Sequence, residues 1–142
     1  MEELFELRSF IEQGRYDDAL ALIGEMEEMS RDDKINKIES FLDILILHLI
    51  KKHAEKRTTR SWETSIQNAA DMICRTNKRR KAGRHYLSRE DLREAISESW
   101  RTALRRAALE AFEGRHDANE LEAMIDRQTI EVEALEIVAP SH

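Results

Sequence analysis

The sequence predicts an all-α protein, a bundle of five or six helices around a buried central helix over about residues 31–54. Three observations support this prediction. The 142 residues include only four Gly and one Pro, fewer turn residues than a sheet-rich domain of this length needs. Apolar residues recur three and four positions apart through most of the chain, which is the spacing of one helix face. Residues 35–50 are apolar on all sides, as expected of a helix that other helices surround.

The first two expected helices form a hairpin over residues 1–29. Leu4, Leu7 and Ile11 share one stripe of a first helix, and Gly14 is a typical helix stop. The same spacing resumes in a second helix at Tyr16, Ala19, Leu20, Ile23 and Met26. We therefore expect two helices joined at Gly14.

The central helix is expected to start at Ser30, whose hydroxyl can cap a helix, with Asp33 in an acidic first turn. The apolar block ILILHLI at residues 44–50 is too short to cross a bilayer. A strand across DILILHLI is the alternative. The preceding KINKIES keeps the helical period and contains no breaker, so the helix is favoured.

Two further helices flank a basic segment. After the polar connection KRTTR, Ser61 is expected to cap a fourth helix that reaches about Thr76. Ser88, followed three residues later by Asp91, predicts the start of a fifth helix that Gly114 ends. The residues between them, about 77–87, are expected to form a basic loop.

A sixth helix is expected to begin at Asp117 or Asn119. The sequence TIEVEALEIV from residue 129 either continues this helix or alternates apolar and acidic residues as a strand. We favour the helix, followed by fraying, so that residues 129–142 form an acidic tail. The whole chain, residues 1–142, is expected to be a single helical domain.

Charge is segregated along the chain. Residues 1–50 carry 5 basic and 13 acidic side chains, residues 51–106 carry 16 and 7, and residues 107–142 carry 2 and 9. Acidic and basic helices can neutralise one another on folding, and this is the favoured interpretation. The alternative is a basic surface for an anionic partner.

The composition favours a reducing cytoplasm over secretion or a membrane. Cys74 is the only cysteine, so no internal disulfide can form. The first residues, MEELFELRSF, lack the basic leader and the unbroken apolar run of a secretory signal. We therefore expect a cytoplasmic protein.

Three blocks between Glu25 and Ile66 resemble a known bacterial family. They are EMEEMSRDDKINKIES, FLDILILHLIKK and RSWETSI, and their spacing also matches. The family is the domain-of-unknown-function family numbered 29. The resemblance implies an all-helical fold and brings no activity, cofactor or substrate.

The basic loop supplies the candidate binding residues. They are Arg75, Lys78, Arg79, Arg80, Lys81, Arg84 and His85. These side chains could neutralise phosphates, with His85 and Tyr86 available to stack on a base. Because the sequence pI is about 5.5, a solvated loop or one docked on the chain's own acidic ends is favoured over a nucleic-acid site.

Two other patterns suggest chemistry. The Arg79–His85 and Arg80–His85 spacings are similar to the signature of HEPN-type RNases, in which Arg holds the phosphate and His aids proton transfer. His48 with Glu25, Glu28 and Glu39 suggests a metal site inside the bundle. A packing role for His48, with a hydrogen bond to a carboxylate or turn, is favoured because His48 belongs to no Glu-x-x-His pair: the residue three positions before it is Leu45.

The sequence favours a non-enzymatic protein-interaction module. It has no Ser-His-Asp order, phosphate-binding Gly loop or Cys-pair zinc spacing, and predicts no catalytic residue, metal or cofactor. We expect a protein partner or self-association, with the basic loop and the acidic tail as contact surfaces. The alternative is an RNA-binding protein or a HEPN-like, metal-independent endoribonuclease acting through residues 75–86.

Overall fold

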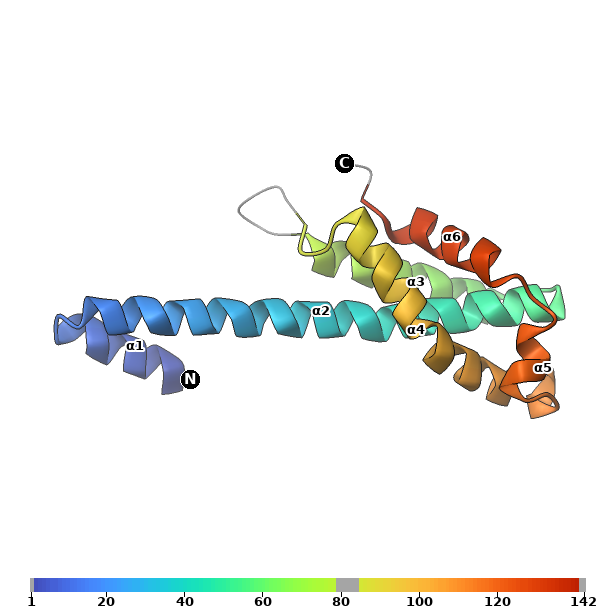
Figure 1. The fold of residues 1–142 in the computed structure, drawn as a ribbon, viewed down its shortest axis with the longest axis horizontal. Helices are drawn as coiled ribbons and strands as arrows, with labels where there is room; N and C mark the ends of the chain where they lie inside the picture. Colours follow the sequence, from blue (N-terminus) through green and yellow to red (C-terminus); the bar gives the residue numbers. More distant parts are fainter. Residues whose placement is uncertain (1, 79–84, 141–142) are drawn as a thin grey trace. The chain divides into compact units, whose positions relative to one another are not determined.

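The computed structural model describes residues 2–78 and 85–140, and within them the chain is helical (Figure 1). The six α-helices are α1 (Glu2–Glu12), α2 (Tyr16–Glu55), α3 (Arg60–Asn77), α4 (Arg89–Glu110), α5 (Ala118–Glu122) and α6 (Arg127–Val138). No strand occurs in these two ranges. The predicted all-α class is confirmed.

The chain divides into two compact units, Met1–Lys34 and Ile35–His142, and α2 supplies residues to both. The predicted helix start at Ser30 is wrong, because α2 is already helical from Tyr16. Gly24 costs only about 1 kcal/mol inside a helix. With no proline between residues 16 and 55, each added residue gains a backbone hydrogen bond and the helix continues. Whether residues 1–142 are one domain stays a prediction.

The hydrophobic core lies within residues 35–142, and the predicted central helix is its axis. The buried residues of this part of α2 are Ile38, Leu42, Leu45, Ile46, Leu47, Leu49, Ile50 and Ala54. Helices α3 to α6 cover them with Ile66, Ile73, Leu92, Ile96, Trp100, Leu104, Leu121, Ile130 and Leu135. The buried central helix is therefore confirmed.

The helix starts follow side-chain capping. The predicted helix start at Ser88 is confirmed: Ser88 and Asp91 form a capping box at the start of α4, in which each side chain accepts a hydrogen bond from the other residue's backbone N–H. The predicted cap of α3 at Ser61 is wrong. Thr59 is the cap, because its hydroxyl accepts a hydrogen bond from the Trp62 N–H at 3.1 Å, and Ser61 already lies inside the helix.

The chain reverses after α4 through left-handed backbone. A short 3-10 turn (Ala111–Gly114) follows α4, and Phe112, Glu113 and Gly114 have φ values of 51°, 58° and 76°. Only glycine adopts this conformation without a steric cost. The Glu55 carboxylate accepts a hydrogen bond from the Phe112 N–H at 3.2 Å, which ties the turn to the end of α2.

The predicted sixth helix is two helices. Asp117 caps α5 in a capping box with Glu120. Asp126 then starts α6 by accepting hydrogen bonds from the N–H groups of Gln128 and Thr129. The favoured helix over TIEVEALEIV agrees with α6, which packs against α4 and α3.

Two leucines of α4 provide a matched test of this core. Leu104 is fully buried, whereas Leu109 is 78% exposed. We predict that Leu104→Ala lowers the free energy of unfolding by about 2–5 kcal/mol. Leu109→Ala should change it by no more than about 0.5 kcal/mol. Urea unfolding followed by circular dichroism measures both, and equal effects would contradict the assigned core.

Candidate interaction surfaces

The unit Met1–Lys34 is a helical hairpin, as predicted, and its turn is set by Gly14. This residue has a φ of 72°, and its N–H donates to the Ile11 carbonyl at 3.1 Å. The next N–H, of Arg15, donates to the Phe10 carbonyl at 2.8 Å, which completes a Schellman ending of α1. The Arg15 guanidinium lies 4.6 Å from the Phe10 ring centroid and pairs with Asp18. These contacts fold α1 back along the first turns of α2 (Figure 1).

The hairpin has few buried residues and many exposed apolar side chains. Ala19 is its one buried residue among those described, and α1 has none. Its large apolar side chains that are exposed are Leu4, Phe5, Ile11, Tyr16, Leu20, Ile23 and Met29. The described part of residues 35–142, although three times longer, has only Leu109, Met124 and Val132 of this kind. Exposed apolar surface is therefore concentrated in the hairpin.

Five of these side chains share one face of the hairpin. On α1, Leu4 and Ile11 lie about a quarter turn around the helix from the half-buried Leu7 and Phe10. On α2, the exposed apolar residues also lie about a quarter turn around the helix from Ala19 and its half-buried neighbours. The rotation has the same sense as on α1. Equal offsets on antiparallel helices point to the same side. Leu4, Ile11, Tyr16, Leu20 and Ile23 thus form one surface, hereafter the hairpin face.

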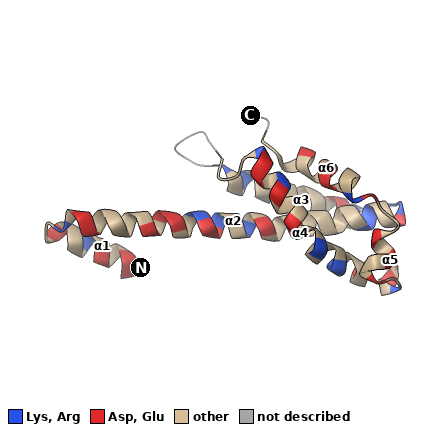
Figure 2. Cartoon of the chain, viewed as in Figure 1, with Lys and Arg blue, Asp and Glu red and all other residues tan. Residues whose placement is uncertain are grey.

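The opposite side of the hairpin is acidic. Glu2 and Glu6 of α1 and Asp18 and Glu25 of α2 have the reverse offset from the half-buried stripes. Residues 1–34 contain 4 basic and 11 acidic side chains, a net charge of −7, and the acidic residues follow both helices (Figure 2). The hairpin therefore has an apolar side and a charged side.

The predicted basic site lies only partly within the described residues. Arg79, Arg80, Lys81 and Arg84 fall outside them, so their candidate role stays a prediction. Arg75 is exposed near the end of α3, and Lys78 and His85 form an isolated antiparallel bridge. The structure thus brings Lys78 and His85 together and leaves the RNA alternative untested.

Asn77 holds the base of this segment, a role that sequence reasoning missed. Its side chain is buried, with the amide nitrogen donating to the Leu87 carbonyl at 3.0 Å and the amide oxygen accepting from the Leu87 N–H at 2.7 Å. The Asn77 carbonyl also accepts from the Tyr86 N–H at 2.9 Å. One side chain therefore fixes the spacing between the end of α3 and the start of α4. An asparagine directly before a charged run was the available signal.

His48 lies in the buried part of α2, beside α4. Its Nδ1 atom is buried and makes no hydrogen bond to the described residues, so the hydrogen bond predicted for His48 is not formed through this atom. Burial lowers the pKa of His48 below its ordinary 6.5, and the positive charges of Lys51 and Arg106 lower it further against the opposing effect of Glu110. The imidazole is thus uncharged at neutral pH. Within the described ranges, no group of three His, Cys, Asp or Glu side chains is arranged to hold a metal ion.

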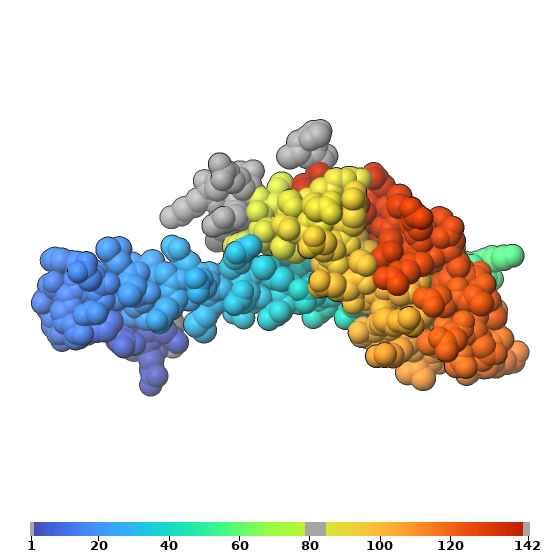
Figure 3. Space-filling view, in the orientation of Figure 1, coloured from blue at the N-terminus to red at the C-terminus, as the bar shows by residue number. Residues whose placement is uncertain are grey.

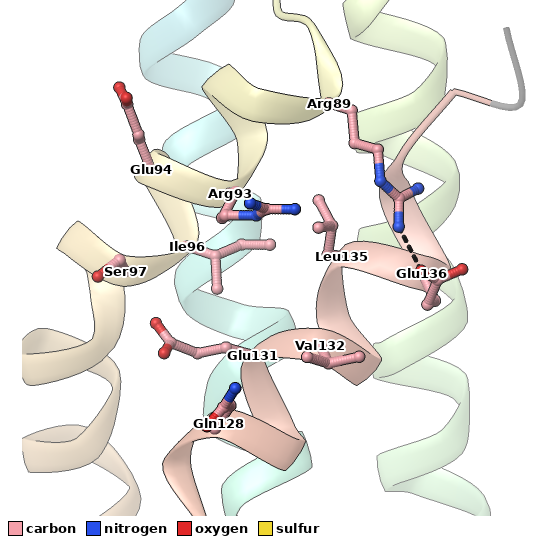
Figure 4. Close-up of a pocket in the computed structure, with 10 residues that line it drawn as sticks. All are labelled: Arg89, Arg93, Glu94, Ile96, Ser97, Gln128, Glu131, Val132, Leu135 and Glu136. Carbon is pink, nitrogen blue, oxygen red and sulfur yellow. Dashed lines mark hydrogen bonds and ion pairs between the residues drawn. The ribbon is translucent and has the colours of Figure 1, made fainter.

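A groove of about 630 Å³ separates α4 from α6 (Figure 4). The two helices lie side by side on the visible face of residues 35–142 (Figure 3). The lining residues are Arg89, Arg93, Glu94, Ile96, Ser97, Gln128, Glu131, Val132, Leu135 and Glu136. Ile96 and Leu135 are buried, which gives the groove an apolar floor.

The cations of this groove are already paired. Arg89 forms an ion pair with Glu136 across the groove (Figure 4). Arg93 pairs with Glu90 of its own helix at 3.2 Å. An anionic ligand would have to displace one of these carboxylates. The arrangement favours a contact that holds α6 on α4 over a ligand site.

The Asn77 contacts predict a large cost for a small change. Asn77→Ala should lower the free energy of unfolding by about 2–6 kcal/mol, because two buried backbone groups of Leu87 lose their partner at about 1–3 kcal/mol each. Asn68→Ala, an exposed position of the same helix, is the matched control. Urea unfolding measures both variants, and equal stability of the two would contradict the role of Asn77.

His48 predicts acid sensitivity. Because its folded pKa lies below 6.5, its contribution to stability is complete above pH 6.5 and is lost as the pH falls through the lowered value. His48→Leu should therefore flatten the decline of unfolding free energy below pH 6.5. Urea midpoints at pH 8.0 and at successively lower pH measure the slope, and identical slopes in wild type and variant would contradict the lowered pKa.

Comparison with known sequences identifies the family. A domain of unknown function, DUF29, matches residues 11–126, well beyond the part on which the resemblance was recognised. No curated protein and no solved structure matches the chain significantly. Among the described helices, none is long and apolar enough to cross a membrane. Because the family match covers most of the sequence, the chain belongs to the DUF29 family.

Proposed function

We propose that this protein is a non-enzymatic protein-interaction module and that the hairpin face binds a polypeptide. The observation that carries the proposal is the exposure of five large apolar side chains on one side of a hairpin. Leu20 is 66% exposed and Tyr16 is 63% exposed, although both belong to a regular amphipathic stripe. Such a stripe normally covers a core.

The hairpin also lacks the interior that a separate unit of its size needs. Units below about 40 residues are stable when a disulfide, a metal or association supplies what a small core cannot. The single cysteine lies outside the hairpin, and the described residues form no metal cluster. Association through the hairpin face would supply the burial that residues 1–34 lack, in addition to the backbone hydrogen bonds of the continuous helix α2.

The contact surface proposed here is the hairpin face and not the tail. Helix α6 buries Ile130, Ala134, Leu135 and Val138, and it packs against α4 and α3. Its apolar side is thereby used inside the unit. The predicted role of residues 129–142 as a partner-binding tail is therefore replaced here by the hairpin face.

Native mass spectrometry of the protein purified gently from its own host tests this function. Wild type should carry an added polypeptide mass, whether another protein or a second copy. Leu20→Glu should lose it, because a carboxylate on the hairpin face cannot be buried without a partner. Leu109→Glu, the same change at an exposed leucine of α4, should keep it.

The same spectra contain the contrary results. If all three proteins have the mass of a bare monomer, or if Leu20→Glu keeps the added polypeptide, the hairpin face is not the contact surface. An added oligonucleotide in place of a polypeptide would support the RNA alternative.

A further inference from the structure

We infer that the polypeptide on the hairpin face is a second copy of this chain, so that two hairpins form an antiparallel four-helix bundle. This inference rests on the proposed function and names its partner. A hairpin is half of such a bundle, and packing two apolar hairpin faces together gives the two-layer arrangement that helical domains commonly use. The association is a symmetric dimer in which the same surface of each copy is buried.

The composition of the face suits contact with itself. Its five apolar members, Leu4, Ile11, Tyr16, Leu20 and Ile23, are uncharged. Arg8, which lies between Leu4 and Ile11 on the same side of α1, is paired with Glu12 of its own helix at 2.9 Å. In a symmetric contact, residue i of one copy meets residue j of the other and the reverse, so an unpaired charge on this surface would be buried twice. On α2 the stripe is followed by Glu27, which has the same helical position one turn later and limits the apolar surface at that end.

The position of the acidic residues distinguishes a second copy from a basic partner. A basic helix would be recognised best by carboxylates around the edge of the apolar surface. Here Glu2, Glu6, Asp18 and Glu25 lie on the opposite side of the hairpin. In a dimer through the hairpin faces, these carboxylates of both copies point outward into water, where salt screens them. These four carboxylates of each hairpin therefore do not oppose this contact strongly.

The exposed area is sufficient for a specific dimer. A large apolar or aromatic side chain has on the order of 200 Å² of surface. With the exposed fractions of the five side chains, the hairpin face offers on the order of 500 Å² per copy. Two copies then bury on the order of 1,000 Å², which reaches the lower limit of specific protein interfaces at about 1,000 Å². We expect a reversible dimer that dissociates on dilution.

Sedimentation equilibrium of the purified chain over a wide concentration range tests the dimer. Wild type and Leu109→Glu should both show a monomer–dimer equilibrium with the same Kd. Leu20→Glu should raise the Kd at least about 100-fold, because a symmetric dimer carries the substitution twice. Circular dichroism of each variant establishes that the core of residues 35–142 remains folded, since Leu20 lies outside it.

Cross-linking locates the contact. In a Cys74→Ser background, Leu20→Cys places a thiol in the middle of the hairpin face, and Glu25→Cys places one on the acidic side. A short bismaleimide should join two copies of the Leu20→Cys protein and leave the Glu25→Cys protein monomeric on a denaturing gel. The reverse pattern, or equal cross-linking of both, would overturn the proposed arrangement.

The outcomes separate this inference from the proposed function. A wild type that sediments as a monomer at all concentrations overturns the dimer, as does a dimer that Leu20→Glu leaves unchanged. If that monomeric protein still binds a different polypeptide in its host and loses it in Leu20→Glu, the proposed function stands and only the second copy is wrong. If neither association occurs, both are wrong.

Discussion

The structure depends on one constraint, the burial of a helix that is apolar on all its sides. Between Ile38 and Ala54, α2 can be stable in water only if other helices surround it. Two of its polar residues, Lys51 and His53, find partners inside the unit. Lys51 is 6% exposed and pairs with Glu110 at 2.9 Å, while its ammonium group lies 4.6 Å from the Trp62 ring centroid. His53 likewise contacts Glu133 of α6 at 2.7 Å. The arrangement of α3 to α6 follows from covering this segment.

The same helix has the opposite property before residue 35. From Tyr16 to Met29 its apolar residues form a stripe with only partial cover, although the backbone remains regular helix. Exposed apolar surface of this kind marks interaction sites in many proteins, and it is the ground on which we propose one here. The difference between the two parts of α2 is the physical basis for assigning a structural role to residues 35–55 and an interaction role to the hairpin.

Much of this fold could be predicted because it depends on local patterns. Helical spacing, the stop at Gly14 and the Ser88 capping box are short-range signals, and each agrees with the structure. Short-range signals could not predict that α2 continues through Ser30. Serine is common both at helix starts and within helices, and only the surrounding residues decide between the two. The choice of Thr59 over Ser61 has the same cause.

The features that define the candidate site are long-range. The amphipathic stripes of residues 1–29 predict a hairpin, but sequence alone does not say that nothing in the unit covers Leu20. In the same way, the acidic alternation of residues 129–138 suggested an available tail, whereas Ile130 and Leu135 are buried against other helices. Spacing indicates which side of a helix is apolar. Tertiary packing decides which apolar sides remain uncovered.

Amide hydrogen exchange as a function of protein concentration tests the central claim most directly. If association through the hairpin face stabilises residues 2–34, their amides should exchange fast in dilute protein and become protected as the concentration rises. The amides of residues 38–54 should stay protected throughout, because the core of their own unit covers them. Hairpin amides that are equally protected at every concentration would contradict the claim that this surface needs a partner.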